Sequence, residues 1–458
     1  MKNESKDKVL MTSISGIRGV IGPGLNSEVA GRMAAAFGTW APEGPIVVGR
    51  DSRVSGDMMR HAVVGALLST GHDVIDLGIA TTPTTEILVT THGAAGGIIL
   101  TASHNPEPWN ALKLLNKEGL FLSQEEGETV LAIERENRAE HKPWDALGSW
   151  SEDSAAAEVH IRSILEQPWL DRDRIAAHKL KAVVDCTNGA GGVIAPELLR
   201  RLGVEVIELH CEPTGYFGRR PEPTPAHLDD LCNAVRENEA HIGFATDPDV
   251  DRLGVVDHTG FALFEEYTLA LAADFYLGKH PGPVVVNLST TRAMDDVCKR
   301  HGVELHRTAV GEANVVARML EVGAAIGGEG NGGVILPSLH AGRDALVGMA
   351  LILQHLAESG RPLADHYASL PTWRMVKRSV ALSRPLPDEE LAELARSEFG
   401  GSLDTTDGVK VDLPEGWIHL RRSNTEPIVR AIAESDSQDA AESLVNRALQ
   451  RLANLTNV

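Results

Sequence analysis

One arrangement of segments occurs three times along this chain of 458 residues. In each copy an apolar segment runs into a polar turn, a helical segment follows, and a second apolar segment opens after a glycine. A third apolar segment then ends in a loop rich in glycine or charge. Strands alternating with helices are typical of parallel-type sheets that bind ligands at the carboxyl ends of their strands. The repeat therefore predicts three α/β units sharing one cleft, with three separate units as the alternative.

The three copies can be followed directly in the sequence. The first strands with their polar turns are 46–51, 182–187 and 284–289, the second strands are 71–75, 203–207 and 302–305, and the closing loops are 97–106, 242–249 and 325–333.

The rest of the chain differs from these copies. After about residue 370, short apolar stretches and two predicted helices, 387–398 and 438–453, indicate a smaller domain. The acidic stretch 123–158 is expected to hold helices and the connection between the first two units. We predict an α/β protein: three tandem α/β domains with related mixed sheets, plus a smaller C-terminal α+β domain, arranged around a central cleft. The predicted domains are 1–155, 156–257, 258–370 and 371–458.

Charge and composition exclude several classes of protein. The 64 acidic against 43 basic residues give a net charge of −21, which repels nucleic acid and requires any anionic ligand to meet local Arg and Lys. The cysteines show neither metal-ligand spacing nor a paired framework. The polar N-terminus and the lack of an apolar run of about 18 residues predict a cytoplasmic protein without a membrane partner. The four cysteines are Cys186, Cys211, Cys232 and Cys298.

The closing loop of the first copy contains a candidate nucleophile. The apolar run Gly97–Leu100 predicts a buried strand, and Asn105-Pro106 stops any helix behind it. Ser103 is therefore expected on a loop at a strand end, where α/β proteins place their chemistry. A serine hydroxyl needs activation by its surroundings, and a simple polar turn is the alternative interpretation.

The closing loop of the second copy overlaps the segment Asp247-Pro248-Asp249-Val250-Asp251-Arg252, which carries three carboxylates at alternate positions. Such carboxylates can converge on a hard cation such as Mg²⁺. A calcium-binding EF-hand loop is unlike this segment, because its sixth position is Arg252 and its twelfth is His258. A solvated acidic turn is the alternative, but the mutual repulsion of the carboxylates favours a bound cation.

The closing loop of the third copy, 327–333, holds five glycines around Glu329 and Asn331. Glycines let the backbone approach a ligand closely, and a carboxylate with an amide suits sugar hydroxyls, which donate and accept hydrogen bonds. The alternative is a flexible linker.

A fourth segment lies in the C-terminal region. Its guanidinium groups and short hydrogen-bond donors around a turn would suit a phosphate dianion. Ser423-x-x-Glu426 is also a capping-box pattern that predicts a helix start. Two N-terminal segments, 13–19 with Arg18 and Arg50-Asp51-Ser52-Arg53, are on their own typical of surface charge. The candidate phosphate-binding residues of the fourth segment are Arg421, Ser423, Asn424, Thr425 and Arg430.

In this order the segments resemble the α-D-phosphohexomutase superfamily, over essentially the whole chain. Thr101–Pro106 matches the phosphoserine loop, Asp247–Arg252 the metal loop, Glu329–Gly332 the sugar-binding loop and Arg421–Arg430 the phosphate loop. The resemblance implies four domains around a deep cleft, the first three α/β and the last of a smaller, different fold.

The resemblance also implies a reaction. Ser103 would carry a phosphate, with Mg²⁺ held by Asp247, Asp249, Asp251 and a phosphoserine oxygen. The phosphoryl group would pass to a hexose phosphate and give a hexose 1,6-bisphosphate, which turns over in the cleft and returns its other phosphate to the serine. The net result exchanges the 1-phosphate and 6-phosphate isomers.

Further residues take roles from the same resemblance. Arg252 would stabilise the transferring group, as expected where positioning and charge neutralisation supply most of the catalysis. Lys113 matches a position credited with proton transfer, and Arg18 matches an active-site arginine. Glu329 and Asn331 would bind the sugar.

One departure affects the proton transfers. Many members carry Ser and His where this chain has Asn331 and Gly333. The missing His removes a candidate acid or base, so Lys113, His104 or His340 would have to take the role.

The preferred substrate pair is glucosamine 6-phosphate and glucosamine 1-phosphate, because segments 13–19 and 327–333 resemble those of phosphoglucosamine mutases. Glucose or mannose phosphate is the alternative. Two other classes are a phosphatase with Asp247 as nucleophile and a non-catalytic sugar-phosphate-binding protein. The protein is expected to be a monomer or homodimer.

Overall fold

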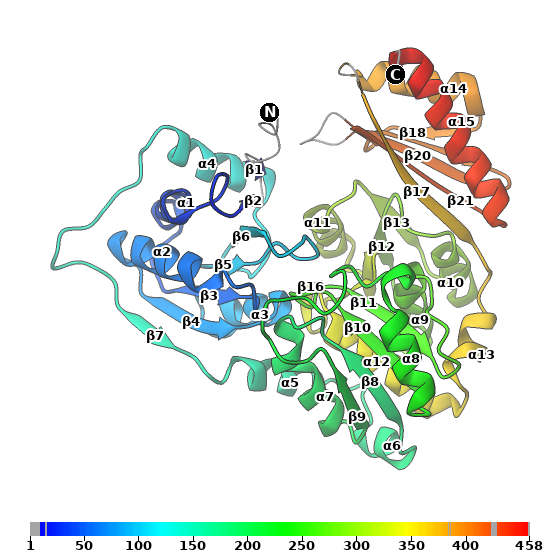
Figure 1. Ribbon diagram of the computed structural model, residues 1–458, viewed down its shortest axis with the longest axis horizontal. Helices are drawn as coiled ribbons and strands as arrows, with labels where there is room; N and C mark the ends of the chain where they lie inside the picture. Colours follow the sequence, from blue (N-terminus) through cyan, green and yellow to red (C-terminus); the bar gives the residue numbers. More distant parts are fainter. Residues whose placement is uncertain (1–9, 14–15, 383, 385, 423–427, 457–458) are drawn as a thin grey trace, which may run out of the picture.

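The computed structural model describes residues 10–13, 16–382, 384, 386–422 and 428–456. Their strands form four sheets (Figure 1). The first sheet lies at the left of the view, the second at the bottom, the third above the second, and the fourth, orange to red, at the upper right. The predicted fold class is confirmed, since three α/β domains are followed by a C-terminal domain of different topology.

The first sheet has seven strands in the order β1-β2-β6-β5-β3-β4-β7. Its strands are β1 (Leu10–Ser13), β2 (Gly16–Val20), β3 (Ile46–Arg50), β4 (Val74–Ile79), β5 (Gly96–Leu100), β6 (Trp109–Leu115) and β7 (Trp150–Glu152), and its helices are α1 (Ser27–Trp40), α2 (Gly56–Ser69), α3 (Thr82–Thr91) and α4 (Gln124–Arg135).

The second and third sheets have the orders β11-β10-β8-β9 and β13-β12-β14-β15-β16. The second contains β8 (Lys181–Asp185), β9 (Glu205–Leu209), β10 (Ile242–Thr246) and β11 (Leu253–Asp257), with α5 (Ala156–Leu165), α6 (Arg172–Ala177), α7 (Ala195–Arg201) and α8 (Asp229–Glu237). The third contains β12 (Val284–Asn287), β13 (Leu305–Thr308), β14 (Ile326–Glu329), β15 (Gly333–Leu336) and β16 (His340–Arg343), with α9 (Glu266–Leu277), α10 (Ala293–His301), α11 (Glu312–Val322), α12 (Ala345–Ser359) and α13 (Leu363–Ala368).

The three sheets repeat one arrangement. In each, the first strand of the copy is central, and the second and third strands pair with it in parallel on either side. The third strand (β5, β10 or β14) then pairs with an antiparallel strand. The closing loops therefore leave equivalent strand ends, as the repeat in the sequence predicts.

The fourth sheet is antiparallel throughout, in the order β17-β21-β20-β19-β18. The predicted helices 387–398 and 438–453 correspond to α14 and α15. Ser423 and Glu426, the pair that predicts a helix start, lie outside the described residues, and residues 428–435 form a strand that pairs with β20. The elements are β17 (Arg374–Ala381), β18 (Ser402–Asp404), β19 (Val409–Leu413), β20 (Gly416–Arg422), β21 (Ile428–Ser435), α14 (Asp388–Phe399) and α15 (Gln438–Thr456).

The buried cores are distributed unequally. One apolar cluster runs from Val184 of the second sheet through Val286 of the third sheet to Leu351 of α12. The first and fourth sheets have clusters of their own, which include Leu67 and Leu420. The second and third units are therefore joined by a common core. No helix within the described part of the chain is long and apolar enough to cross a membrane.

Candidate active site

A cavity of about 560 Å³ has walls from all four sheets. Ser103 lines it after β5, Arg252 before β11, Asn331 after β14, and Arg430 lies on β21. The three closing loops and the C-terminal sheet therefore meet in one place, as expected for a shared cleft. Of the predicted site residues, the cavity is lined by Arg18, Ser103, His104, Lys113, Arg252, Glu329, Asn331 and Arg430.

The Ser103 loop is held in an uncommon backbone conformation. Ser103 has φ +49°, in the left-handed region that non-glycine residues seldom adopt. Its backbone N–H donates to Thr101 Oγ1 at 2.9 Å, and its Oγ donates to Asp247 Oδ2 at 2.8 Å. His104 Nδ1 lies 3.3 Å from the same Oγ. The loop thus presents the serine hydroxyl to the acidic residues of the next sheet.

A buried arginine fixes this loop. Arg53 donates from Nη2 to the carbonyl oxygens of Ser103 (2.6 Å) and Asn105 (2.7 Å), and from Nη1 to those of Pro106 (2.7 Å) and Trp109 (2.9 Å). Its Nε lies 3.0 Å from Asp51 Oδ2, and neither side chain of this pair is exposed. The interpretation of this segment as surface charge is wrong for both residues, because these buried bonds satisfy their charges. The position of Asp51 and Arg53 directly after the first predicted strand was the sequence signal that could have placed them near the site.

The three metal-loop carboxylates converge. Asp247, Asp249 and Asp251 are buried, and each offers an oxygen within 4.8 Å of those of the other two. Val250 between them has φ +67°, a strained conformation for a β-branched residue that is typical of functional sites.

The charge balance of the triad fits a divalent cation. Burial and the neighbouring Asp251 and Asp249 raise the pKa of Asp247 well above its ordinary value. The Oδ1 atoms of Asp249 and Asp251 are buried and accept no hydrogen bond from the described residues. Carboxylate oxygens are the ligands that Mg²⁺ prefers, so this donor set suits that ion.

Lys113 on β6 neutralises part of this charge. Its Nζ lies 2.7 Å from Asp249 Oδ2 and 3.5 Å from Asp251 Oδ2, and Thr82 also donates to Asp249. Burial lowers the pKa of Lys113, but the two aspartates outweigh it and raise the pKa above its ordinary value. Burial likewise raises the pKa of Asp249, but Lys113 holds it below the ordinary range.

Two further arginines and a histidine border the serine. Arg18 on β2 donates to Asn105 Oδ1 at 2.7 Å, and Arg252 donates to Glu222 Oε1 at 2.8 Å. Arg252, followed by burial and Arg18, lowers the pKa of His104 well below its ordinary value. The cavity is therefore locally cationic beside the serine, against the acidic background of the chain.

The glycine-rich segment is a hairpin and not a flexible linker. β14 and β15 pair antiparallel across it, and Gly332 has φ +89°, which favours glycine. Glu329 is buried, and its Oε1 accepts from Asn287 Nδ2 at 2.9 Å and from the Gly311 N–H at 3.1 Å. Burial raises the pKa of Glu329, but Arg343 outweighs it and lowers the pKa below its ordinary value.

The C-terminal sheet supplies two cations to the cavity, Arg430 and Lys377. Lys377 also lies 3.1 Å from Glu265 and 3.0 Å from Glu266. Arg421 is held by Asp407 at 2.7 Å and is not among the described residues that line the cavity. The predicted residues Ser423, Asn424 and Thr425 lie outside the described part of the chain.

Sequence reasoning missed Arg343, which lines the cavity and contacts the metal loop. No local pattern marks it, because its partners come from distant segments. His340, a candidate for the missing histidine's role, does not line the cavity in the described residues. Its Nδ1 lies 3.4 Å from Glu86 and its Nε2 3.4 Å from Asp344.

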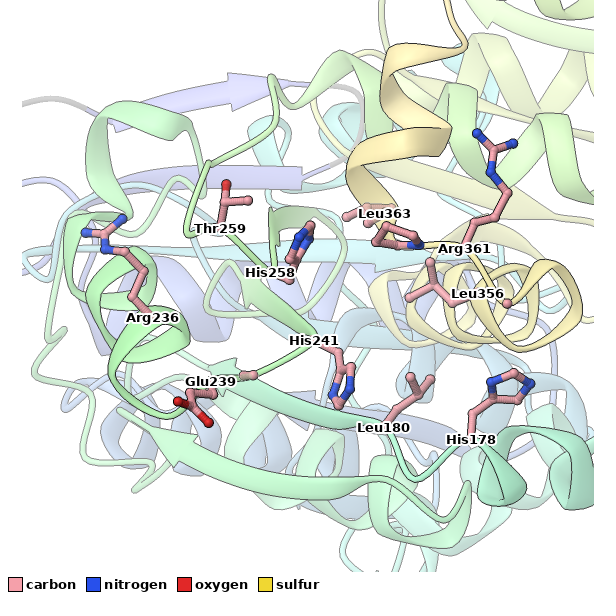
Figure 2. Close-up of a pocket in the computed structure, with 13 residues that line it drawn as sticks. His178, Leu180, Arg236, Glu239, His241, His258, Thr259, Leu356, Arg361 and Leu363 are labelled. Atoms are coloured by element: carbon pink, nitrogen blue, oxygen red, sulfur yellow. The ribbon is translucent and has the colours of Figure 1, made fainter.

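A second cavity, of about 580 Å³, lies between the second sheet and the end of α12 (Figure 2). Figure 2 shows Arg236 and Arg361 on opposite sides of it, with His241 and His258 between them and His178 below Arg361. Its cations therefore do not converge, and none of the predicted site residues lines it.

Comparison with known proteins extends over nearly the whole chain. Four family models match in order: phosphoglucomutase/phosphomannomutase alpha/beta/alpha domain I at residues 11–141, domain II at 158–260, domain III at 265–373 and the C-terminal domain at 376–450. A probable phosphoglucosamine mutase of Methanopyrus kandleri is 38% identical over 434 residues, 94% of this chain and 95% of that protein. A phosphoglucomutase/phosphomannomutase of Thermococcus kodakarensis is 36% identical over 446 residues, 95% and 97% of the two chains.

Solved structures show the same relationship. The crystal structure of a phosphoglucomutase/phosphomannomutase family protein from Burkholderia thailandensis superposes with a TM-score of 0.84 at 29% identity. The match covers 97% of this chain and 98% of that one.

Proposed function

The chain belongs to the phosphoglucomutase/phosphomannomutase family and is a phosphohexomutase, and from that premise we propose glucosamine 6-phosphate and glucosamine 1-phosphate as its preferred substrate pair. Probable phosphoglucosamine mutases recur among the similar proteins, which supports this choice. Glucose and mannose phosphates are the second candidates, because the Thermococcus protein carries the phosphoglucomutase/phosphomannomutase name.

The observation that supports the reaction is the single cavity that gathers the serine loop, the metal loop and the glycine-rich hairpin. Ser103 is proposed to carry the phosphoryl group. The P–O bond to Ser103 Oγ breaks as a P–O bond to the sugar hydroxyl forms. The hydroxyl proton passes to a group lining the cavity, and the departing Ser103 Oγ takes up a proton. The bisphosphate then turns over, and its other phosphate returns to the serine with the reverse proton transfer.

Named residues are proposed for each part. His104, whose Nδ1 lies 3.3 Å from Ser103 Oγ, and Lys113 are the candidates for the proton transfers. Glu329 and Asn331 would accept from and donate to the sugar hydroxyls. Arg430 would hold the phosphate that is not reacting, with Arg421, Ser423, Asn424 and Thr425 as further candidates from the same segment of the sequence.

Asp247, Asp249, Asp251 and a phosphoserine oxygen would hold Mg²⁺, which when bound neutralises charge on the phosphoryl group. Arg18 and Arg252 add fixed positive charge on the cavity side of the same serine. In this proposal, residues of the third and fourth sheets bind the sugar and its second phosphate.

The test is an assay of the purified protein with Mg²⁺, a trace of glucose 1,6-bisphosphate and, separately, glucosamine, glucose and mannose 1-phosphates. We expect the highest kcat/KM with glucosamine 1-phosphate. Equal or higher kcat/KM with another sugar overturns the substrate choice.

The serine itself is tested by Ser103→Ala, which should abolish turnover while leaving hexose phosphate binding largely intact. Ser163→Ala, on α5, is the matched control, because the Ser163 hydroxyl donates to the Val159 carbonyl of the same helix. Full activity of Ser103→Ala would contradict phosphoryl transfer through this serine. Phosphate mapped to Asp247 instead of Ser103 by mass spectrometry would favour a phosphatase.

A further inference from the structure

We propose that Arg343 is a positioning residue that couples the metal loop to the sugar loop, and that position 333 is glycine to leave room for it. This inference rests on the phosphohexomutase function proposed above. It gives a role to a residue that no motif in the sequence marks.

Arg343 joins three carboxylates from three parts of the fold. Its Nη2 donates to Asp251 Oδ2 at 2.6 Å, and its Nε donates to Glu312 Oε2 at 3.0 Å. Its Nη1 lies 3.1 Å from Glu329 Oε2. The first partner belongs to the metal loop, the second to the start of α11 and the third to the sugar loop. One planar guanidinium therefore fixes the spacing between the metal site and the sugar site.

The environment makes this bridge stiff. The Arg343 side chain is 10% exposed, and its three partners are exposed by 0 to 7%. In such a site a charged hydrogen bond is stronger than at the surface, and an unpaired carboxylate is costly. The backbone N–H of Arg343 also donates to Glu312 Oε1 at 2.8 Å. Glu312 therefore accepts from both the backbone and the guanidinium group of Arg343. Movement of one carboxylate is thereby transmitted to the other two.

The bridge also divides the oxygens of Asp251. Oδ2 accepts from Arg343, whereas the buried Oδ1 has no hydrogen-bond partner among the described residues. Arg343 thus orients Asp251 so that one oxygen is available to a cation. At the other end it holds Glu329, whose second oxygen accepts from Asn287 and Gly311.

Position 333 is where the Arg343 side chain passes. A Cβ added at Gly333 would overlap the Cδ of Arg343 and would lie 2.9 Å from its Cγ. Gly333 does not have a positive φ, so space and not backbone conformation requires glycine here. Any side chain at 333 must displace the arginine. Gly333 stands where many family members carry histidine. In this chain Gly333 and the buried Arg343 therefore depend on each other.

A double-mutant cycle tests the pairing. The proteins are the parent, Gly333→Ala, Arg343→Ala and the double variant. The readouts are the Kd of glucosamine 6-phosphate with Mg²⁺ by calorimetry, and kcat/KM. We expect each single change to weaken binding and lower kcat/KM by roughly 30-fold. The double variant should equal Arg343→Ala within about twofold, because Gly333→Ala acts only through the arginine. If the fold-losses in affinity and kcat/KM of the two single variants multiply in the double variant, the pairing is overturned.

The Arg343→Lys variant tests whether the site needs the bridging geometry of the guanidinium or only its positive charge. An ammonium keeps the charge but cannot hold three carboxylates in the planar geometry, so we expect kcat to stay at least about tenfold low while the fold is retained. Parent-like kcat in Arg343→Lys overturns the bridge. The control is Arg174→Lys, because Arg174 donates to the Ala357 and Glu358 carbonyls at the far end of α12.

The two proposals fail in distinguishable ways. A parent protein that turns over no hexose phosphate overturns the proposed function, while the calorimetric cycle still reports on Arg343. An active parent with a multiplicative cycle overturns only the inference about Arg343.

Discussion

At the scale of single residues, the site depends on charges that are buried and paired. Arg53 holds four backbone carbonyls of the Ser103 loop together with Asp51, and Lys113 is held between Asp249 and Asp251. Removing one member of such a pair leaves the other charge buried without compensation. The cost therefore appears both in stability and in the geometry of the loop.

Replacing Arg53 with Met tests this directly. We expect the free energy of unfolding to fall by about 3 to 5 kcal/mol, because Asp51 loses its buried partner. Urea unfolding gives the stability, and the mutase assay gives turnover. Arg201→Met, whose partners Glu158 and Glu197 are on the surface, should change stability far less. Equal losses in the two variants would contradict the role of burial.

Replacing Asp249 with Asn tests the metal assignment. The variant loses one carboxylate of the triad and leaves Lys113 without its nearest partner. We expect the Mg²⁺ concentration for half-maximal activity to rise on the order of 10- to 100-fold. Asp257→Asn is the control, because Asp257 caps the turn at Thr259 after β11. An unchanged Mg²⁺ response in Asp249→Asn would count against the assignment.

At the scale of the elements, Asp344 ties three of them together. Its Oδ1 accepts from the N–H groups of Leu346 and Val347 at the start of α12, and its Oδ2 accepts from His160 of α5 at 2.9 Å. The same Oδ2 lies 3.4 Å from His340 on β16. A single carboxylate therefore caps a helix and anchors a second helix and a strand.

This network predicts a pH dependence of stability. Burial lowers the pKa of His340, but Asp344 and Glu86 outweigh it and raise the pKa to about 10. Because this exceeds the ordinary value of 6.5, the stabilisation is complete below pH 6.5 and is lost as the pH rises through about 10. The difference in free energy of unfolding between the parent and His340→Gln should shrink across that range in denaturant titrations. A difference that grows with pH would contradict the prediction.

The elements also show what the sequence can and cannot predict. The strands before Asp51, Thr187 and Ser289 were predictable because each is a local apolar run, and Ser103 and the three aspartates stand in local patterns. Arg343 was not, because an isolated Arg is usually exposed. The burial of Arg53 was also missed, although its place after the first strand was a signal. Their partners lie far along the chain: Ser103 is 50 positions from Arg53, and Asp251 is 92 positions from Arg343.

At the scale of the whole molecule, the cavity joins parts that have separate cores. The second and third sheets share one apolar cluster, whereas the first and fourth have their own. The fourth sheet meets the third through polar links, among them Glu434 with the N–H of Arg292, and Lys377 with Glu266. A ligand that contacts all four walls would add to these links.

We therefore expect ligand to protect the fourth sheet most. With Mg²⁺ and glucosamine 6-phosphate at 100 times its Kd, bound protein gains about 2.7 kcal/mol over the unfolded state. Hydrogen exchange of residues 374–456, followed by mass spectrometry, should slow more than exchange in the shared core around Leu351. Protection confined to the Ser103 loop would show that the ligand does not reach β21.

The equivalent strand ends of the three α/β units have a consequence for engineering. Because β5, β10 and β14 each pair in parallel with the central strand of their own sheet, the loops that follow them are mounted on interchangeable supports. A change of length in one loop leaves the strand registers of the other two units untouched. Loop length can therefore be varied at one strand end at a time, whereas side-chain changes must respect the contacts between loops, namely Ser103 with Asp247 and Arg343 with Asp251 and Glu329.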